Sequence, residues 1–523
     1  MRLRSLLLVV VLLVTSAFAQ DLASFEKRIS VHKLANGMTF VVMRRPQAPV
    51  FSFFTYVNVG SVQEPAGETG LAHMFEHMAF KGTTDIGTTN WPAESIALRK
   101  VEVAYAAYNA ERLKRVGQDK QKLAQLHDAW QQAMNDAEKY VVKNAFPEIV
   151  EENGGADLNA FTNDDQTAYF YSMPVNRLEL WAYLESDRYA HPVFREFYQE
   201  RNVVMEERRM RTESSPVGRL VEQFLAQAFI AHPYHHPTIG WASDVESFSA
   251  TDARRFYDRY YIPANMVVAV VGDVDPAYVD KLADEYFARI PGKPRPLPMA
   301  TVEPPQNAER HVVLHDASQP IYLEGYHRPS YLSPDDPVYD VMADILSRGR
   351  TSRLYRSLVR DKRIALTVAG FTGFPGVKYP QLFAFYALPN QGHTTDELRR
   401  AIHEELEKLK SQPVTDEELQ MTKTRAKADL IRSLNSNSGM AQALATYQTL
   451  YGDWRELFRS VDRIDKVTKQ DILRVANETF AANNRTVGII ETAPPPQAAP
   501  PPPPAAPPPA APQAPQAPQK GGR

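Results

Sequence analysis

Short runs of apolar residues in the first half of the chain have the spacing of β-strands. His32–Leu34 and Met38–Met43 flank Asn36-Gly37, a dipeptide that favours the tight turn of a β-hairpin. Val50–Val59 is predicted to be the next strand. The continuous apolar run Met266–Gly272 predicts a strand buried on both faces.

Other segments of this half have the apolar spacing of amphipathic helices or of a strand pair. Leu158–Pro174 predicts two strands with a polar turn at Asn163–Asp165. The predicted helices are Ala145–Asn153, Asn176–Ala190, Glu196–Met210, Leu220–Ala231, Ala250–Tyr260 and Ala277–Ile290.

Ala93–Val142 has a different character, since it is rich in Ala, Lys, Arg, Glu and Gln and is broken only near Gly117. Leu123, Leu126, Trp130 and Met134 have the spacing of one buried stripe on a helix. We predict two long helices that fold back as a protruding hairpin. One continuous solvated helix is the alternative.

The second half repeats this order of elements after a proline-rich linker, Pro291–Pro305. The predicted elements are a strand-like stretch at Val312–Tyr326, a helix at Pro337–Arg348, a strand at Gln381–Ala387, and helices at Thr395–Ser411 and Asp416–Ser433. The closing segment Ala482–Ile490 matches Pro263–Val271 in pattern. We predict an α+β protein of two tandem, similar α/β halves, residues 20–290 and 306–492, with a helical insertion at about 93–142.

The two ends of the chain differ from this body. Residues 1–19 have a charged start, the apolar stretch Leu6–Val14 and the small-residue site Ala17-Phe18-Ala19, which predicts a signal peptide and export to the bacterial periplasm. A retained N-terminal anchor is the alternative. Residues 493–523 are rich in Pro and Ala and are predicted to be a disordered tail, either a spacer or a contact for a partner.

Composition narrows the classes of function. The formal net charge is −3, which provides no electrostatic basis for binding nucleic acid. The chain has no cysteine, so disulfides are excluded and stability must come from large cores. No segment after the signal peptide is long and apolar enough to be a permanent membrane span.

The sequence HMFEH, His73 to His77, carries the candidate chemistry. Histidines four residues apart lie on one face of a helix, about one turn apart, and neutral imidazoles are good zinc ligands. Glu76 stands one residue before the second histidine, where a carboxylate can take a proton from an activated water. The alternative is a core helix with two satisfied histidines and a surface glutamate.

The run from Gly60 to Thr83 resembles the zinc-binding segment of the M16 family of peptidases (pitrilysin, insulinase and mitochondrial processing peptidase), which carry the order H-x-x-E-H. The resemblance extends over about Phe25–Thr492. It implies the tandem layout, a Zn²⁺ cofactor held by His73 and His77, and Glu76 as general base.

The segment Glu200–Met210 resembles the family segment that supplies the third zinc ligand. The resemblance implies Glu207 as that ligand and Glu200 as a catalytically important carboxylate that orients a ligating imidazole. Glu206 lies on another face of the predicted helix and is interpreted as a bystander. The alternative is an ordinary charged helix. From His77 to Glu207 is 130 positions, longer than is usual in the family. We attribute the excess to the helical insertion.

Two further segments bear on substrate and partner. Leu158–Thr162 resembles the substrate-binding edge strand of the family, which implies contacts with peptide by Asn159, Ala160 and Phe161. In the second half, Arg360 holds the position of a substrate-binding arginine, but Thr367 stands where the family has a tyrosine. This resembles the zinc-bearing member of a pair of unlike M16 subunits. The alternative is that another residue replaces the tyrosine.

These features together predict an exported zinc endopeptidase that hydrolyses peptides or unfolded segments. Its partners are expected to be peptide substrates and a second M16-like subunit in a hetero-oligomer, with a homodimer also open. The alternative function is a non-catalytic, M16-fold subunit for peptide binding or assembly. The histidine-rich run His232–Pro237 is interpreted as a structural turn.

Overall fold

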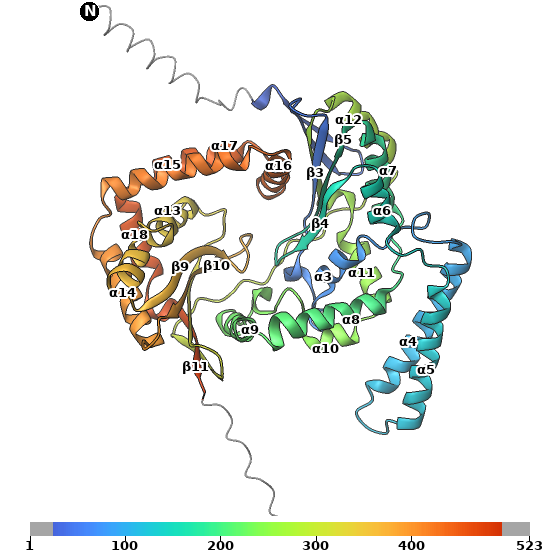
Figure 1. The fold of residues 1–523 in the computed structure, drawn as a ribbon, viewed down its shortest axis with the longest axis horizontal. Coiled ribbons are helices and arrows are strands. Elements are labelled where there is room, and N and C mark those ends of the chain that lie inside the picture. Colours follow the sequence, from blue (N-terminus) through green and yellow to red (C-terminus); the bar gives the residue numbers. More distant parts are fainter. Residues whose placement is uncertain (1–24, 494–523) are drawn as a thin grey trace, which may run out of the picture.

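The computed structural model describes residues 25–493, which form two mixed β-sheets placed side by side, each covered by helices on both faces (Figure 1). The predicted signal peptide and the Pro/Ala-rich tail lie outside the described residues. The α+β architecture of two similar halves is confirmed.

The sheet of the first half has six strands in the order β1-β2-β6-β3-β5-β4. The strands are β1 Ile29–Lys33, β2 Thr39–Arg44, β3 Val50–Val57, β4 Ala156–Thr162, β5 Thr167–Pro174 and β6 Met266–Gly272. Asn36-Gly37 makes the predicted β1–β2 turn, where Gly37 has a φ of 96°. Every residue of β6 is buried, because it lies between β2 and β3 under both layers of helices.

Most helices of the first half pack on one face of this sheet and enclose its core. They are α3 Leu71–Met78, α6 Ala145–Glu152, α7 Leu178–Ala190, α8 Phe197–Arg208, α10 Ala242–Ser247, α11 Ala250–Tyr260 and α12 Pro276–Leu282. Helix α9, Pro216–Ala228, belongs to the same half but packs elsewhere, as described below. A π-helical turn, Arg209–Glu213, continues α8.

The predicted helical hairpin is present and projects from the first half (Figure 1). Its helices are α4 Trp91–Arg112 and α5 Lys120–Glu138. The side chains of Asn90 and Asp119 accept hydrogen bonds from backbone N–H groups of the first turns, which caps both helices. Gly117, with a φ of 73°, lies in the connection. The insertion therefore leaves and returns to the body at one place.

The sheet of the second half has five strands in the order β7-β11-β8-β10-β9. The strands are β7 Arg310–Asp316, β8 Ile321–Arg328, β9 Ala365–Phe374, β10 Gln381–Pro389 and β11 Arg485–Thr492. Its helices are α13 Asp336–Ser347, α14 Thr395–Ser411, α15 Asp416–Ser433, α16 Asn437–Tyr451, α17 Glu456–Lys466 and α18 Lys469–Thr479. Residues Tyr355–Asp361 form a π-helical segment, η7.

The strand-like stretch Val312–Tyr326 is divided between two strands, β7 and β8, with a turn between them. The Asp316 carboxylate accepts a hydrogen bond from the Ser318 N–H at 2.9 Å and turns the chain there. β7 then pairs parallel to β11 and β8 pairs antiparallel to it, on its other side.

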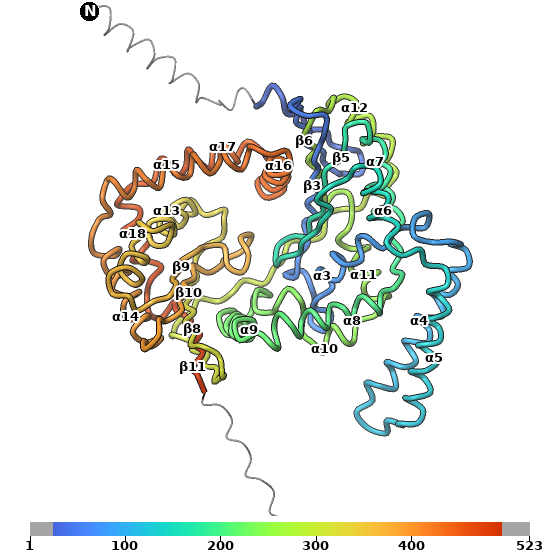
Figure 2. The backbone as a smooth tube through the Cα atoms, viewed as in Figure 1, coloured from blue at the N-terminus to red at the C-terminus, as the bar shows by residue number. Residues whose placement is uncertain are grey.

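One helix of each half packs on the sheet of the other half. Helix α16 of the second half packs on β3 and β6 of the first sheet, where its residues Met440 and Leu444 join an apolar cluster with Phe54 and Tyr56. Helix α9 of the first half packs on β7 and β11 of the second sheet. The chain crosses between the halves through residues 291–309, which contain neither helix nor strand (Figure 2).

A polar contact also joins the turns that follow β4 and β9. The Asp165 carboxylate accepts hydrogen bonds from the Tyr234 hydroxyl at 2.6 Å and from the Val377 N–H at 2.5 Å. The Lys378 ammonium donates to the Asn58 side chain and to the Asp165 carbonyl, and burial lowers the pKa of Lys378 to about 8. Tyr234 belongs to the His232–Pro237 run, which here makes a structural contact.

Candidate metal centre

The HMFEH segment is part of helix α3, and the N-terminus of this helix is anchored by hydrogen bonds. Gly70 precedes the helix with a φ of 99°, and the Glu64 carboxylate accepts hydrogen bonds from the N–H groups of Gly70 at 2.8 Å and Ala72 at 2.6 Å. A carboxylate at this end satisfies donors that have no partner inside the helix. Burial raises the pKa of Glu64. The start of α3 is thus fixed to the loop before it.

Helix α8 brings a carboxylate to the two histidines. The Nε2 atom of His77 is 3.3 Å from Oε2 of Glu207, and Nε2 of His73 is 3.8 Å from the same oxygen. One ligand atom from each of these three residues lies within 4.8 Å of the others. The structure therefore brings together the three residues that the sequence analysis selected as metal ligands.

This set of atoms fits a zinc ion. Ligand atoms about 2.0–2.2 Å from a tetrahedral ion lie about 3.3–3.6 Å from one another, close to the two separations found here. Burial lowers the pKa of His73 to about 3, so its imidazole is neutral near pH 7 and offers a lone pair. Two imidazoles and one carboxylate also match the ligand types of hydrolytic zinc sites, which leave a fourth position open.

Glu200 lies behind His77 and fixes its orientation. Its Oε2 atom is 3.4 Å from Nδ1 of His77, so the carboxylate favours the tautomer that leaves Nε2 free. Burial alone would lower the pKa of His77, but the hydrogen bond to Glu200 and the charge of Glu207 outweigh it and raise that pKa. This contact is compatible with the positioning role expected of Glu200, which stays a prediction.

Lys81, which follows α3, completes this arrangement. Its ammonium lies 2.5 Å from Glu200 and 3.1 Å from Glu196, both half-buried. Burial would raise the pKa of Glu200, but hydrogen bonds from His77 and Lys81 lower it. The spacing of four residues between His77 and Lys81 could have indicated this arrangement, because residues four apart on a helix are neighbours.

Replacing Lys81 by methionine is expected to weaken zinc binding about tenfold, within the range found for groups that position a metal ligand. Glu200 would lose its cationic partner and hold His77 less firmly. Competition with a chromophoric zinc chelator measures the dissociation constant for zinc. Lys81→Arg should retain most of the affinity of the parent protein.

Lys139→Met is the matched control, because Lys139 is an exposed lysine paired with Asp136 on the helical hairpin. A zinc dissociation constant that is the same in Lys81→Met as in the parent protein would contradict the positioning role.

Glu76 interacts electrostatically with His77 and Glu207 of the cluster, and it also contacts Thr162 of the edge strand β4. It is half-buried on α3, and burial raises its pKa although hydrogen bonds from Thr162 on β4 oppose the shift. A carboxylate with a raised pKa, placed one residue before a candidate ligand, is suited to accept a proton near neutral pH. Thr162 is a second contact that the sequence analysis did not single out.

Strand β4 is the edge of the first sheet and contacts α3. Within residues 25–493 it pairs only with β5, so its outer edge has no strand partner. Asn159 is exposed, Phe161 is half-buried and Ala160 is buried. The structure places these three residues beside the cluster, and their contact with a peptide remains a prediction.

The structure does not bring Arg360 into the cluster. Arg360 is exposed in η7 of the second half, and its guanidinium pairs with Asp361 at 2.6 Å. Thr367 is exposed on β9, the edge strand of the second sheet. Neither residue is among the contacts of His73, His77 or Glu207 in the described part of the chain.

Two charged residues near Glu207 differ in their relation to it. Glu206 is exposed and pairs with Arg209 at 2.6 Å, away from the histidines. Arg211 donates to Oε1 of Glu207 at 2.6 Å, which leaves Oε2 facing the imidazoles. Arg211 was not selected from the sequence.

Known proteins resemble this chain over most of its length. The family described as Insulinase (Peptidase family M16) matches residues 39–100, and the one described as Peptidase M16 inactive domain matches residues 247–426. The zinc protease PqqE of Helicobacter pylori is 30% identical over 486 residues, which is 91% of this chain and 96% of that protein.

Solved structures resemble the fold as well. A protease from Helicobacter pylori has a TM-score of 0.73 and 28% identity, with 89% of this chain and 99% of that chain covered. The periplasmic protease PqqL from Escherichia coli has a TM-score of 0.64 and 18% identity, with 90% of this chain but only 48% of that chain covered.

Proposed function

The chain belongs to peptidase family M16, and on that premise we propose that it is an exported zinc-dependent endopeptidase. The observation that carries this proposal is the convergence of His73, His77 and Glu207 within 4.8 Å, with Glu76 on the same helix. The substrates are peptides or unfolded segments, which can reach an edge strand in extended form.

The chemistry proposed for the site divides between the metal and the side chains. Zinc, when bound, polarises a peptide carbonyl and lowers the pKa of a water molecule. Glu76 accepts the proton of the attacking water at its carboxylate and returns it to the leaving amine. Glu200 and Lys81 keep His77 in the tautomer and orientation that ligation needs.

The outer edge of β4 is the proposed substrate-binding strand. A peptide that adds to this edge forms main-chain hydrogen bonds and runs past Thr162, whose side chain contacts Glu76. Asn159 and Phe161 are then placed to contact the side chains of the peptide. The strand therefore links substrate binding to the proposed general base.

We further propose that a second M16-like subunit completes the site. Thr367 is too short to reach or donate as the expected tyrosine would, and Arg360 is occupied by Asp361. PqqL, in which this chain corresponds to about half of the length, has room for a second such unit within one polypeptide. A partner that carries an arginine and a tyrosine would supply what this chain lacks.

Export to the bacterial periplasm is part of the proposal. It rests on the composition of residues 1–19 and on the likeness to PqqL, which is described as periplasmic. Within residues 25–493, none of the helices has the length and apolar character needed to cross a membrane.

Metal removal tests the catalytic proposal. The mature chain is expected to bind about one zinc per molecule, to lose cleavage of a quenched fluorescent peptide library on chelation, and to regain it when zinc is added back. Elemental analysis and the rate of fluorescence increase give the two readouts.

A metal-free protein that still cleaves at the same rate would exclude zinc catalysis. Zinc binding without cleavage, even with an M16-like partner that carries the arginine and the tyrosine, would favour the non-catalytic subunit instead. Full activity of the chain alone would exclude the need for a partner.

A further inference from the structure

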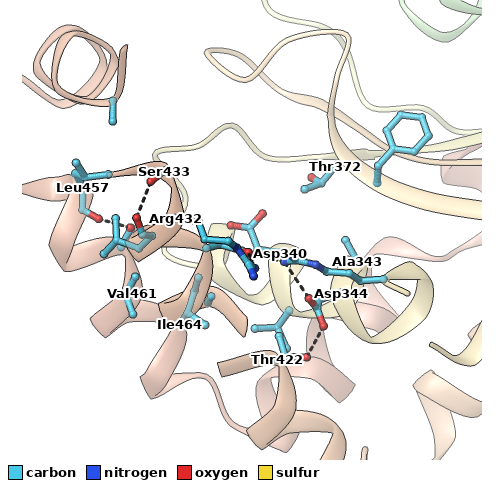
Figure 3. Close-up of a pocket in the computed structure, with 18 of the residues that line it drawn as sticks. Asp340, Ala343, Asp344, Thr372, Thr422, Arg432, Ser433, Leu457, Val461 and Ile464 are labelled. Atoms are coloured by element: carbon cyan, nitrogen blue, oxygen red, sulfur yellow. Dashed lines mark hydrogen bonds and ion pairs between the residues drawn. The ribbon is translucent and has the colours of Figure 1, made fainter. Parts of the chain in front are cut away.

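The second half contains a cavity of about 990 Å³ between strand β9 and helices α13, α15, α16 and α17 (Figure 3). Its walls are largely apolar and include Val341, Phe371, Leu430, Val461 and Ile464. A cavity of this size, with apolar walls and a few polar groups, has the properties of a ligand site.

The cavity occupies the same place in its half as the metal centre does in the other. In both sheets the strand before the site helix pairs antiparallel with the closing strand of that half, and the opposite edge strand lies beside the helix. Helix α3 contacts β4 and α8, and helix α13 contacts β9 and α15 in the corresponding way.

The residues at this place are carboxylates, whereas those of the metal centre include two imidazoles. Helix α13 carries Asp340 and Asp344 with the spacing of four that separates His73 from His77. Because no histidine lines the cavity, it lacks the zinc-binding character of the first half.

Almost every charge in the cavity is neutralised by a neighbour. Asp344 lies 3.0 Å from Arg425 and 3.4 Å from Arg348, and it accepts a hydrogen bond from the Thr422 hydroxyl at 2.9 Å. Asp429 pairs with both Arg348 and Arg432. These groups form a closed network on one side of the cavity.

Asp340 is the exception. Within residues 25–493 it has neither a hydrogen-bond partner nor an ion-pair partner, and its carboxylate points into the cavity (Figure 3). The protein around it and the charge of Asp336 raise the pKa of Asp340 to about 7, although its side chain is accessible to solvent. A carboxylate without a partner in apolar surroundings gains from a cation placed beside it.

We propose that this cavity binds a lysine or arginine side chain of a peptide substrate, with Asp340 as the counter-ion. The long aliphatic part of either side chain would lie on the apolar walls while its charged end pairs with Asp340. A small inorganic cation would leave those walls uncovered. This inference rests on the proposed function only in taking a peptide as the substrate.

Peptide binding to the full chain tests the inference without relying on cleavage. Two dye-labelled, N-acetylated nine-residue peptides that differ at one position, lysine or norleucine, are titrated at pH 8 with the Glu76→Gln protein, and fluorescence anisotropy gives the dissociation constants. Asp340→Asn in that background is expected to weaken the lysine peptide about tenfold and to leave the norleucine peptide unchanged.

Asp128→Asn is the matched control, because Asp128 is 86% exposed on the helical hairpin and loses the same charge. It should change neither dissociation constant. Ala343→Leu, which fills part of the cavity, should weaken both peptides. If the Asp340→Asn protein keeps the parent ratio of the two constants, the inference is wrong.

Two further outcomes separate this inference from the proposed function. A norleucine peptide with a free amino terminus provides the first. If Asp340 strengthens binding of this peptide but not of the N-acetylated lysine peptide, the group bound in the cavity is a terminal amine and not a side chain, and the assignment is wrong. Asp340-dependent binding of the lysine peptide by a protein that never cleaves would support the subsite and refute the peptidase.

Discussion

Replacing Glu76 by glutamine is expected to lower kcat for peptide cleavage by about 1,000-fold while zinc remains bound. Glutamine has nearly the same shape as glutamate but cannot accept the proton of the attacking water. Loss of a positioned general base costs between about 100- and 10,000-fold in rate. Glu76 is outside the group of candidate ligands, so the metal content should not change.

Steady-state cleavage of a quenched fluorescent peptide and elemental analysis of the same preparation check both parts of this expectation. Glu68→Gln is the matched control, since Glu68 precedes α3 and pairs with Arg255 at 2.9 Å away from the cluster. Unchanged cleavage in Glu76→Gln would show that another group takes the proton. Loss of zinc as well would place Glu76 among the ligands.

The second large effect is expected from Glu207→Gln, which should weaken zinc binding by more than about 100-fold. Groups that only position a ligand cost about 10- to 100-fold when they are replaced, and removal of a charged ligand should exceed that range. The loss has two causes: a neutral amide oxygen replaces a carboxylate, and Arg211 is left without its partner.

Glu206→Gln provides a control one residue away, because Glu206 is exposed and directed to Arg209. Competition titrations should find the zinc dissociation constant of Glu206→Gln equal to that of the parent protein. Equal effects of the two substitutions would show that the charge of α8, rather than a specific ligand, determines affinity. A larger effect at Glu206 would reverse the assignment.

Local signals explain why much of the fold could be predicted. Asn36-Gly37 marks a hairpin turn, the apolar run Met266–Gly272 marks a central strand, and Gly117 marks the reversal between α4 and α5. Each signal acts within a few residues, through allowed backbone angles or through burial on both faces of a sheet. Such signals do not depend on how the halves pack.

In the second half, local sequence signals did not predict every element. Strand β9 was not predicted, because it is an edge strand of mixed burial and its pattern lacks the alternation of a half-buried strand. Helix α16 was also not predicted, and its apolar residues are buried against the sheet of the other half. No spacing within α16 identifies that remote surface.

The residue types alone indicated the chemistry of the metal centre. Two histidines one turn apart and a glutamate between them predict a metal-binding helix with a base, since helical periodicity fixes which side chains share a face. The resemblance of the later segment pointed to Glu207 and Glu200. Only the tertiary structure decided that α8 reaches α3, because 130 positions and an inserted hairpin separate His77 from Glu207.

Packing between segments that are remote in the sequence also determined contacts of charged side chains that no sequence motif indicates. Lys81 holds Glu200, Thr162 contacts Glu76, and Asp340 faces a cavity without a partner. A charged side chain gains or lacks a partner according to which elements meet in space, and its pKa follows from that neighbourhood. Sequence spacing specifies faces of helices and strands, whereas the contacts between those faces depend on the whole fold.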